Sequence, residues 1–117
     1  MRLLITGSAG FVGKHTVDHL LRNTNWEIIG LESFRHGGFS SRVRDKITDR
    51  YKIITHDLST PVDDYTLSEI GKIDYVLNLA SRSHVDDSIT NPTPFVKNNV
   101  DLMCNVLDMC RKLQPEK

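Results

Sequence analysis

The chain has 117 residues with 38% apolar content, which suits one compact domain with a single core. Its 15 basic and 15 acidic residues balance, so no net charge favours nucleic acid or an anionic membrane surface as a partner. No apolar run approaches the roughly 20 residues of a membrane span. No leader pattern is visible either, so we expect a cytoplasmic protein.

Apolar runs and helical spacing alternate along the chain. In chain order the pattern predicts a strand over 2–6, a helix over 11–22, a strand over 26–31, a loop over 33–41, a short helix near 41–48, a strand over 51–55, a helix over 63–70, a strand over 73–79, a polar loop over 81–91 and a helix over 92–113. Strand and helix alternate four times, which is typical of an α/β fold with an open, doubly wound parallel sheet of the Rossmann type.

The first predicted strand runs into a turn where glycines recur at three-residue spacing as a helix begins. Gly7 would permit the tight turn, Gly10 would let the backbone approach a pyrophosphate, and Gly13 would let helix and strand pack closely. The helix start adds free N–H groups and the positive end of its dipole. The pattern indicates a dinucleotide phosphate site; a turn that merely requires positive φ angles is the alternative.

Glu32 stands nineteen residues after Gly13, at the end of the second predicted strand. A carboxylate there can accept both hydroxyls of an adenosine ribose and repels a 2′-phosphate, which favours NAD over NADP. Arg35 and His36 follow closely and could soften this preference, because an arginine at this edge can accommodate the 2′-phosphate. A solvated loop carboxylate is the other interpretation of Glu32.

The two cysteines, Cys104 and Cys110, lie six residues apart on the last predicted helix, too distant in rise and angle for a disulfide. We expect both to be buried thiols of a reducing cytoplasm. The five histidines are scattered along the chain, so the sequence predicts no metal site.

Three segments, 5–13, 56–58 and 79–88, carry a resemblance that extends over the whole chain. The chain resembles the extended short-chain dehydrogenase/reductase family, in particular its nucleotide-sugar 4,6-dehydratases, epimerases and decarboxylases. The third segment is most similar to the corresponding segment of the dTDP-glucose 4,6-dehydratases. The resemblance implies that residues 1–117 are the N-terminal, four-strand portion of an NAD-binding Rossmann domain. The parent enzyme would act on a nucleotide sugar.

The resemblance also implies which residues hold the cofactor. Phe11 and Val12 would cover the pyrophosphate. The adenosine ribose would be lined by Glu32, Ser33, Phe34 and Arg35, whereas the adenine would meet Asp57 at its amino group and Leu58 beside its ring. The nicotinamide half would be followed by Leu79, Ala80, Ser81, Ser83 and Asn98, with Ser83 also touching the sugar nucleotide.

Some positions depart from the family or allow a second interpretation. Relatives often have Asn-x-Gly-Thr where this chain has Asn-Val-Asp-Leu at 99–102, and the dehydratases carry Glu where this chain has Arg82. Asp57 could instead be an N-cap or turn residue, and His84 a structural hydrogen-bonding side chain. We expect Asp86 and Asp87 to be solvated loop charges.

Members of the family use a Tyr and a Lys four residues apart, and no tyrosine here has such a lysine. We therefore expect no catalytic residue in this chain, because hydride transfer would lack its general base. The chain would be the NAD-binding portion of a nucleotide-sugar dehydratase or epimerase, unable to catalyse the reaction alone. The alternative is a non-catalytic dinucleotide-binding module or a partner of a full-length relative.

The last predicted helix has two neighbouring apolar stripes, together too wide for one buried face. One stripe contains Val96, Val100, Met103, Leu107 and Cys110, and the other contains Leu102, Val106, Met109 and Leu113. The extra stripe would cover strands outside this chain or pair across a homodimer. The fourth strand would lie at an open edge of the sheet.

Overall fold

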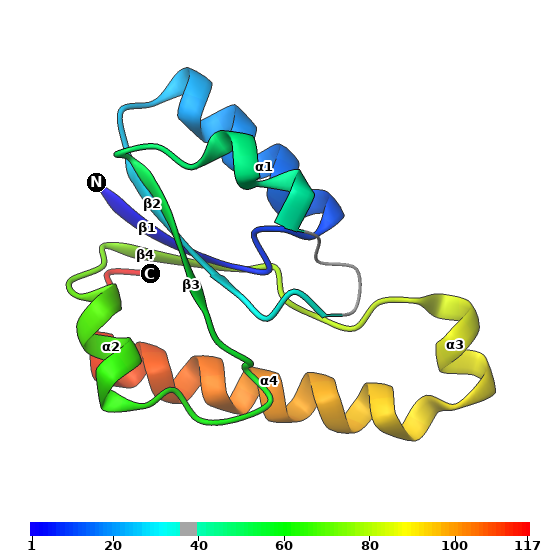
Figure 1. Cartoon of the computed structure of the whole chain (residues 1–117). Helices are drawn as coiled ribbons and strands as arrows, with labels where there is room; N and C mark the ends of the chain where they lie inside the picture. The colour runs from blue at the N-terminus through cyan, green and yellow to red at the C-terminus, as the bar shows by residue number, and fades with distance from the viewer. Residues whose placement is uncertain (36–39) are drawn as a thin grey trace.

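Four strands form one parallel sheet in the computed structural model, which describes residues 1–35 and 40–117 (Figure 1). Their bounds are Arg2–Thr6 for β1, Glu27–Glu32 for β2, Tyr51–Thr55 for β3 and Tyr75–Asn78 for β4. The order across the sheet is β3-β2-β1-β4, and every neighbouring pair is parallel. The chain moves outward from β1 to β3 and then returns to the other side of β1, so the Rossmann-type doubly wound sheet is confirmed.

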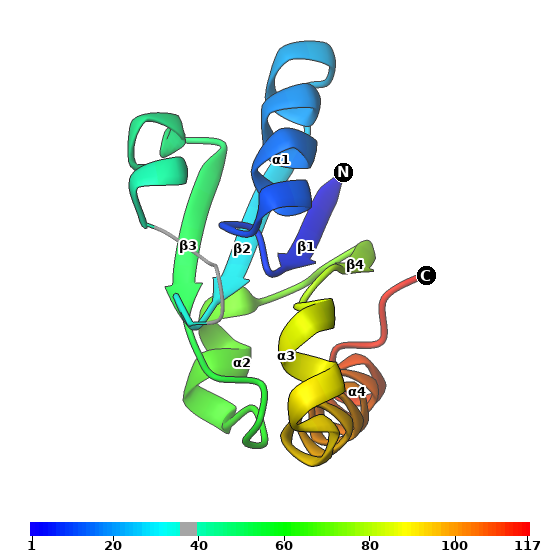
Figure 2. The same cartoon turned by 90° about the vertical axis from the view of Figure 1, so that its right-hand side faces the viewer.

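Helices cover both faces of this sheet (Figures 1 and 2). On one face lies α1, Phe11–Asn23, beside two short 3-10 turns at Ser40–Arg42 and Arg44–Lys46. On the opposite face lie α2, Asp64–Ile70, and the long α4, Pro92–Leu113. The short α3, Val85–Thr90, lies beyond the carboxyl ends of the strands (Figure 1).

Side chains that alternate along each strand build one core on each face of the sheet. Leu3 and Ile5 of β1 pack with Val17 of α1. Leu4, between them, packs in the other cluster with Val106 and further residues of α4. Because both faces of the central strands are covered, the middle residues of β1 and β2 carry no polar side chain, as a buried parallel sheet requires.

Three predicted elements differ from the structure. Residues 85–90 form α3 where a polar loop was expected, because six residues are too few for a helical period to show. The helix expected near 41–48 is replaced by the two 3-10 turns, and β4 is shorter at both ends than the predicted strand over 73–79. Of the loop expected over 33–41, the part that contains His36 and the adjacent glycine pair lies outside the described residues.

The outer edge of β4 is partly paired by the end of the chain. The Glu116 N–H donates to the Asp74 carbonyl at 2.8 Å, and the Val76 N–H donates to the Lys117 carbonyl at 2.8 Å. The Tyr75 hydroxyl donates to the Glu116 carboxylate at 3.0 Å, and this bond raises the pKa of Tyr75. The expectation of an open edge is thus correct for the sheet order but wrong for these backbone groups.

The two stripes of α4 have different environments. Leu102, Val106 and Met109 are buried against the sheet. The four leading members of the other stripe, Val96, Val100, Met103 and Leu107, are between 45% and 63% exposed.

The expectation that both cysteines are buried is wrong. Cys104 is exposed and Cys110 is half-buried; both are free thiols. Position 104 lies about 200° around the helix from Leu102, so its side chain points away from the core. Cys110 lies closer to the buried stripe, and burial raises the pKa of its thiol.

Neither a membrane-spanning helix nor a metal-binding cluster occurs within residues 1–35 and 40–117. Over these residues no helix combines the length and the apolar character that crossing a bilayer would need. The same residues bring together no group of three or more histidine, cysteine, aspartate or glutamate side chains that could hold a metal ion.

The close approach of α1 to the preceding turn depends on Gly13. A Cβ at this position would lie 2.1 Å from the Gly7 carbonyl oxygen and 2.8 Å from the Ser8 Cα. Both atoms belong to the backbone, so neither can move aside without displacing the turn. A Cβ on Gly10 would meet the same oxygen only at 3.2 Å.

Gly13→Ala is therefore expected to lower the free energy of unfolding by about 1–3 kcal/mol, the range found for overpacked sites. Urea denaturation measures this loss. Gly10→Ala is the matched control, because it adds the same methyl group to the same turn with much less crowding. Equal losses for the two variants would contradict the role assigned to Gly13.

Candidate functional site

The glycine turn crosses from β1 to α1 at the point where the strand order reverses. Gly7 has a φ of +69°, and a Cβ there would lie 2.9 Å from the backbone of Ala80, which follows β4. The Gly7 N–H donates to the Leu31 carbonyl at 3.0 Å, which joins the turn to β2 as well. Gly7 therefore satisfies both the backbone angle and the close approach that the turn needs.

The start of α1 faces the crevice at the carboxyl ends of the strands. Its N-cap is Gly10, and no side chain of the described residues caps this end. The first N–H groups of the helix therefore have no partner within α1 and, with the helix dipole, can bind an anion. Phe11 and Val12, in this first turn, are exposed.

The Thr6 hydroxyl joins the ends of β1 and β4. It accepts hydrogen bonds from the backbone N–H groups of Leu79 and Ala80, both at 3.1 Å, and donates to the Asn78 side chain at 2.5 Å. These three bonds fix the segment after β4 beside the glycine turn. Leu79 and Ala80, which the sequence analysis assigned to the nicotinamide half, are thus held next to Gly7.

The Glu32 carboxylate braces the glycine turn from the end of β2. One oxygen accepts from the Ala9 N–H at 2.9 Å, and the other accepts from the N–H groups of Ser33 and Phe34 at 3.0 and 3.1 Å. The residue is 6% exposed, and it lines a pocket beside Gly7 and Gly10. Glu32 is therefore not a solvated loop carboxylate but a buried acceptor of three backbone hydrogen bonds that also lines the pocket.

Two adjoining pockets occupy the crevice and share Gly7, Gly10, Leu79 and Ser81. The first is also lined by Leu31, Glu32, Ser33, Arg35, His56, Asp57, Leu58, Ala80, Asn98 and Leu102. The second continues past the start of α1 and is also lined by Phe11, Val12, Gly13, Arg42, Arg82, Ser83, His84 and Asp87. The two pockets adjoin at these shared residues, and their linings together extend from Asp57, after β3, to Asp87 of α3.

Asp57 lies in a turn directly after β3, on the outer side of the first pocket. Its carboxylate accepts from the Ser59 N–H at 3.0 Å and forms an ion pair with Arg35. The Thr60 N–H donates to the Asp57 carbonyl at 3.0 Å. The interpretation of Asp57 as a turn residue therefore describes its backbone correctly, while its side chain lines the pocket.

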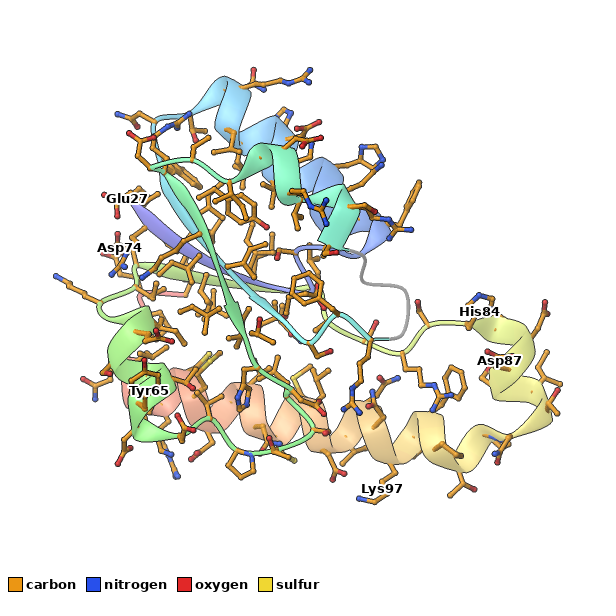
Figure 3. All side chains as sticks on the ribbon, viewed as in Figure 1. Glu27, Tyr65, Asp74, His84, Asp87 and Lys97 are labelled. Carbon is orange, nitrogen blue, oxygen red and sulfur yellow. The ribbon has the colours of Figure 1, made fainter. Side chains whose placement is uncertain are left out.

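Charged side chains flank the second pocket. Arg42 donates to the Ala9 carbonyl at 3.3 Å, which places its guanidinium beside the glycine turn. His84 and Asp87 belong to α3 and its N-cap, far from Glu27 and Asp74 at the other end of the sheet (Figure 3). Asp86 and Asp87 are exposed as expected, although they lie in the first turn of a helix and not in a loop.

Asn99 anchors the segment after β4 to α4. Its side chain accepts from the Arg82 N–H at 2.8 Å and donates to the Arg82 carbonyl at 3.0 Å. The Arg82 guanidinium lies 4.3 Å from the centre of the Phe95 ring, a cation–π contact. Arg82, where the sequence departs from the dehydratases, is thus held by Asn99, the position of the 99–102 segment that agrees with the family pattern.

The structure brings nearly all the predicted cofactor residues to this cavity. Phe34 is the exception, because its side chain packs against the core on the α1 side. Sequence reasoning did not select Leu31, His56, Leu102, Arg42, Arg82, His84 and Asp87. His56 and Leu31 adjoin predicted residues and could have been found as strand-end neighbours, but no motif marks Arg42, which a 3-10 turn brings in.

The three tyrosines lie outside both pocket linings. Tyr51 is fully buried beneath the glycine turn, near Gly30, and burial raises the pKa of its hydroxyl. Tyr65 is exposed on α2 (Figure 3), and Tyr75 lies on β4 with Glu116.

Comparison with known proteins gives consistent matches. A family model described as the NAD dependent epimerase/dehydratase family matches residues 3–117. The dTDP-glucose 4,6-dehydratase of Salmonella typhimurium is 32% identical over 113 residues, which cover 96% of this chain and 31% of that protein. The low-salt glycan biosynthesis protein Agl12 of Haloferax volcanii is 31% identical over 111 residues, covering 92% of this chain and 34% of that protein. The chain spans about a third of the length of these relatives.

Solved structures share the same fold. DesIV, a dTDP-glucose 4,6-dehydratase from Streptomyces venezuelae with NAD and TYD bound, has a TM-score of 0.85 and 29% identity, covering 99% of this chain and 37% of that one. The UDP-glucuronic acid 4-epimerase from Bacillus cereus, in complex with UDP-glucuronic acid and NAD, has a TM-score of 0.77 and 26% identity, covering 95% of this chain and 36% of that one.

The bracing by Glu32 predicts the effect of a nearly isosteric change. In Glu32→Gln an amide NH2 replaces one of the two accepting oxygens, so at least one backbone N–H faces a donor. We expect the free energy of unfolding to fall by about 1–3 kcal/mol, measured by denaturation in urea. Glu27→Gln, on the exposed end of the same strand, is the control; its ion pair with Arg2 is largely exposed, so the change should be about 0.5 kcal/mol or less. Indistinguishable variants would show that the carboxylate does not hold the turn.

Proposed function

Since this chain belongs to the NAD dependent epimerase/dehydratase family, we propose that it binds NAD as the cofactor-holding portion of a nucleotide-sugar 4,6-dehydratase or epimerase. One observation carries the proposal: the Glu32 carboxylate is bonded to the Ala9 N–H of the glycine turn. A ribose acceptor and a phosphate-binding helix start therefore lie side by side, in the arrangement that a dinucleotide needs.

The residues present fit NAD along the whole cavity. The uncapped start of α1, with Phe11 and Val12, would bind the pyrophosphate, and Glu32, with Ser33 and Arg35 beside it, would accept the adenosine ribose. Asp57 and Leu58 would contact the adenine. The nicotinamide half would lie against Leu79, Ala80, Ser81, Ser83 and Asn98, with Ser83 also reaching the sugar nucleotide.

NAD would supply hydride chemistry, and the residues of this chain would bind and orient it. The Thr6 hydroxyl would keep the segment after β4 against the glycine turn, so that the nicotinamide would pack against a rigid surface. The chain contains no Tyr-x-x-x-Lys pair, so we propose that the general base belongs to another part of the parent enzyme. That parent would be a cytoplasmic lyase or isomerase.

The missing Tyr and Lys pair also supports a second candidate function, a non-catalytic module that binds a dinucleotide in the same site. In both cases residues 1–117 act as one NAD-binding unit. The two differ in whether a polypeptide carrying a general base completes the site. Mixing the chain with the separately produced catalytic part of a relative, and measuring turnover, distinguishes them.

We expect NAD at a hundredfold excess over its Kd to raise the free energy of unfolding by about 2.7 kcal/mol, and NADP at the same concentration to raise it less. The Glu32 charge repels the 2′-phosphate, which contributes to the difference. Thermal unfolding with each cofactor measures both effects.

Glu32→Ala should remove most of the stabilisation by NAD, because the ribose loses its acceptor. Glu27→Ala is the matched control, since Glu27 begins the same strand at the end remote from the cavity (Figure 3). An equal response of the unaltered chain to NAD and NADP would overturn the role of Glu32.

We also propose that a second copy of the chain covers the exposed stripe of α4. Val96, Val100, Met103 and Leu107 form one continuous apolar row along the helix, and such a row is complementary to itself about a two-fold axis. Strands from outside this chain are the competing occupant of the row.

Analytical ultracentrifugation tests this proposal. The chain should sediment as a dimer, and Val100→Glu combined with Leu107→Glu should convert it to a monomer, because carboxylates would be buried without partners. Tyr65→Glu, which places a carboxylate on the exposed face of α2, should leave the dimer intact. A monomeric unaltered chain would contradict pairing through α4.

A further inference from the structure

An ion pair between Arg35 and Asp57 spans the outer side of the first pocket. Arg35 follows β2 and Asp57 follows β3, so the pair bridges the ends of two neighbouring strands. Both side chains line the pocket together with Glu32. The side chains of Arg35 and Asp57 are 54% and 35% exposed, so both can be reached by a ligand from solvent.

The backbone directs Arg35 toward this partner. Phe34 has a φ of +57°, a left-handed conformation that is unusual for an aromatic residue. Its N–H is bonded to the Glu32 carboxylate, and its side chain packs against the core on the α1 side. The N–H and the side chain of Phe34 are therefore both fixed. The Arg35 side chain that follows pairs with Asp57 at the end of β3.

Asp57 is held in place for the interaction as well. One of its oxygens accepts from the Ser59 N–H, and the other pairs with the Arg35 guanidinium. The carboxylate thus has one oxygen committed to its own turn and one committed to Arg35.

The charges that line the first pocket determine whether Arg35 can bind a phosphate group. The described lining of the first pocket holds two carboxylates, Glu32 and Asp57, and one guanidinium. Left alone with Glu32, Arg35 would offer its planar set of donors to a phosphate, for which arginine is well suited. Paired with Asp57, it is neutralised, and the second carboxylate adds repulsion toward a phosphate dianion.

We propose that the Arg35–Asp57 ion pair determines cofactor specificity by withholding Arg35 from the 2′-phosphate of NADP. The inference rests on the proposed dinucleotide site and adds to it a positive residue whose effect is cancelled by its neighbour. Glu32 alone does not set the preference for NAD. Arg35 is suited to bind the 2′-phosphate of NADP, and its ion pair with Asp57 prevents that binding.

Asp57→Asn tests the inference, because it removes the charge and keeps an oxygen for the Ser59 N–H. Isothermal titration gives the Kd values for NAD and NADP, and their ratio is the readout, since any effect through the adenine falls on both cofactors. The ratio should shift toward NADP by roughly tenfold, the size of one charge-assisted hydrogen bond. Adding Arg35→Gln to Asp57→Asn should abolish this gain.

The matched control is Asp18→Asn. Asp18 also pairs with a cation, Lys46, and its side chain is 34% exposed, but it lines neither pocket. Its substitution should leave the ratio unchanged, which removes net charge as the explanation.

An Asp57→Asn variant with the original ratio would overturn the inference, and so would a gain that persists without Arg35. In either case NAD binding by the unaltered chain would leave the proposed function standing. An unaltered chain that binds neither cofactor would contradict the proposed function itself.

Discussion

The approach of Gly13 to the carbonyl oxygen of Gly7 is the contact on which the site depends. With no Cβ at position 13, the first turn of α1 can lie directly on the backbone that leaves β1. This contact places the uncapped N–H groups of the helix at the carboxyl ends of the strands. Glu32 then secures the turn from β2 through the Ala9 N–H, and Thr6 secures the segment after β4. These contacts join the carboxyl ends of the strands, the start of α1 and the Glu32 carboxylate into one arrangement.

Much of this arrangement could be predicted from the sequence, because its signals are local. The spacing of Gly7, Gly10 and Gly13 between an apolar run and a helical period specifies a turn in which positions 7 and 13 have no room for a Cβ. The strand and helix periods are strong wherever an element is long, as in α1 and α4. The parallel order of the strands follows from their alternation with helices, and it brings Glu32, Asp57 and Leu79 to one edge.

The rest depends on contacts between distant segments, which leave no period or motif. The ion pair of Arg35 with Asp57 follows a left-handed residue at Phe34, where the side chain gives no reason to expect one. The bonds from Asn99 to Arg82 join segments that are 17 residues apart. Cys104 was misplaced because a cysteine on an amphipathic helix was assigned by its type, whereas its angle around the helix decides its exposure. Local patterns thus predict the elements, and tertiary contacts decide how their charges combine.

Glu116 and Lys117 occupy part of the outer edge of β4, and this contact affects how other strands could pair there. A bare edge of a parallel sheet can template the addition of strands from other molecules, which nucleates insoluble fibrils. Here the Glu116 N–H and the Lys117 carbonyl already occupy hydrogen-bonding positions on that edge. An incoming strand would have to displace these two residues before it could form hydrogen bonds with β4. Glu116 and Lys117 therefore shield part of this edge of the sheet, and their charges disfavour the addition of another strand there.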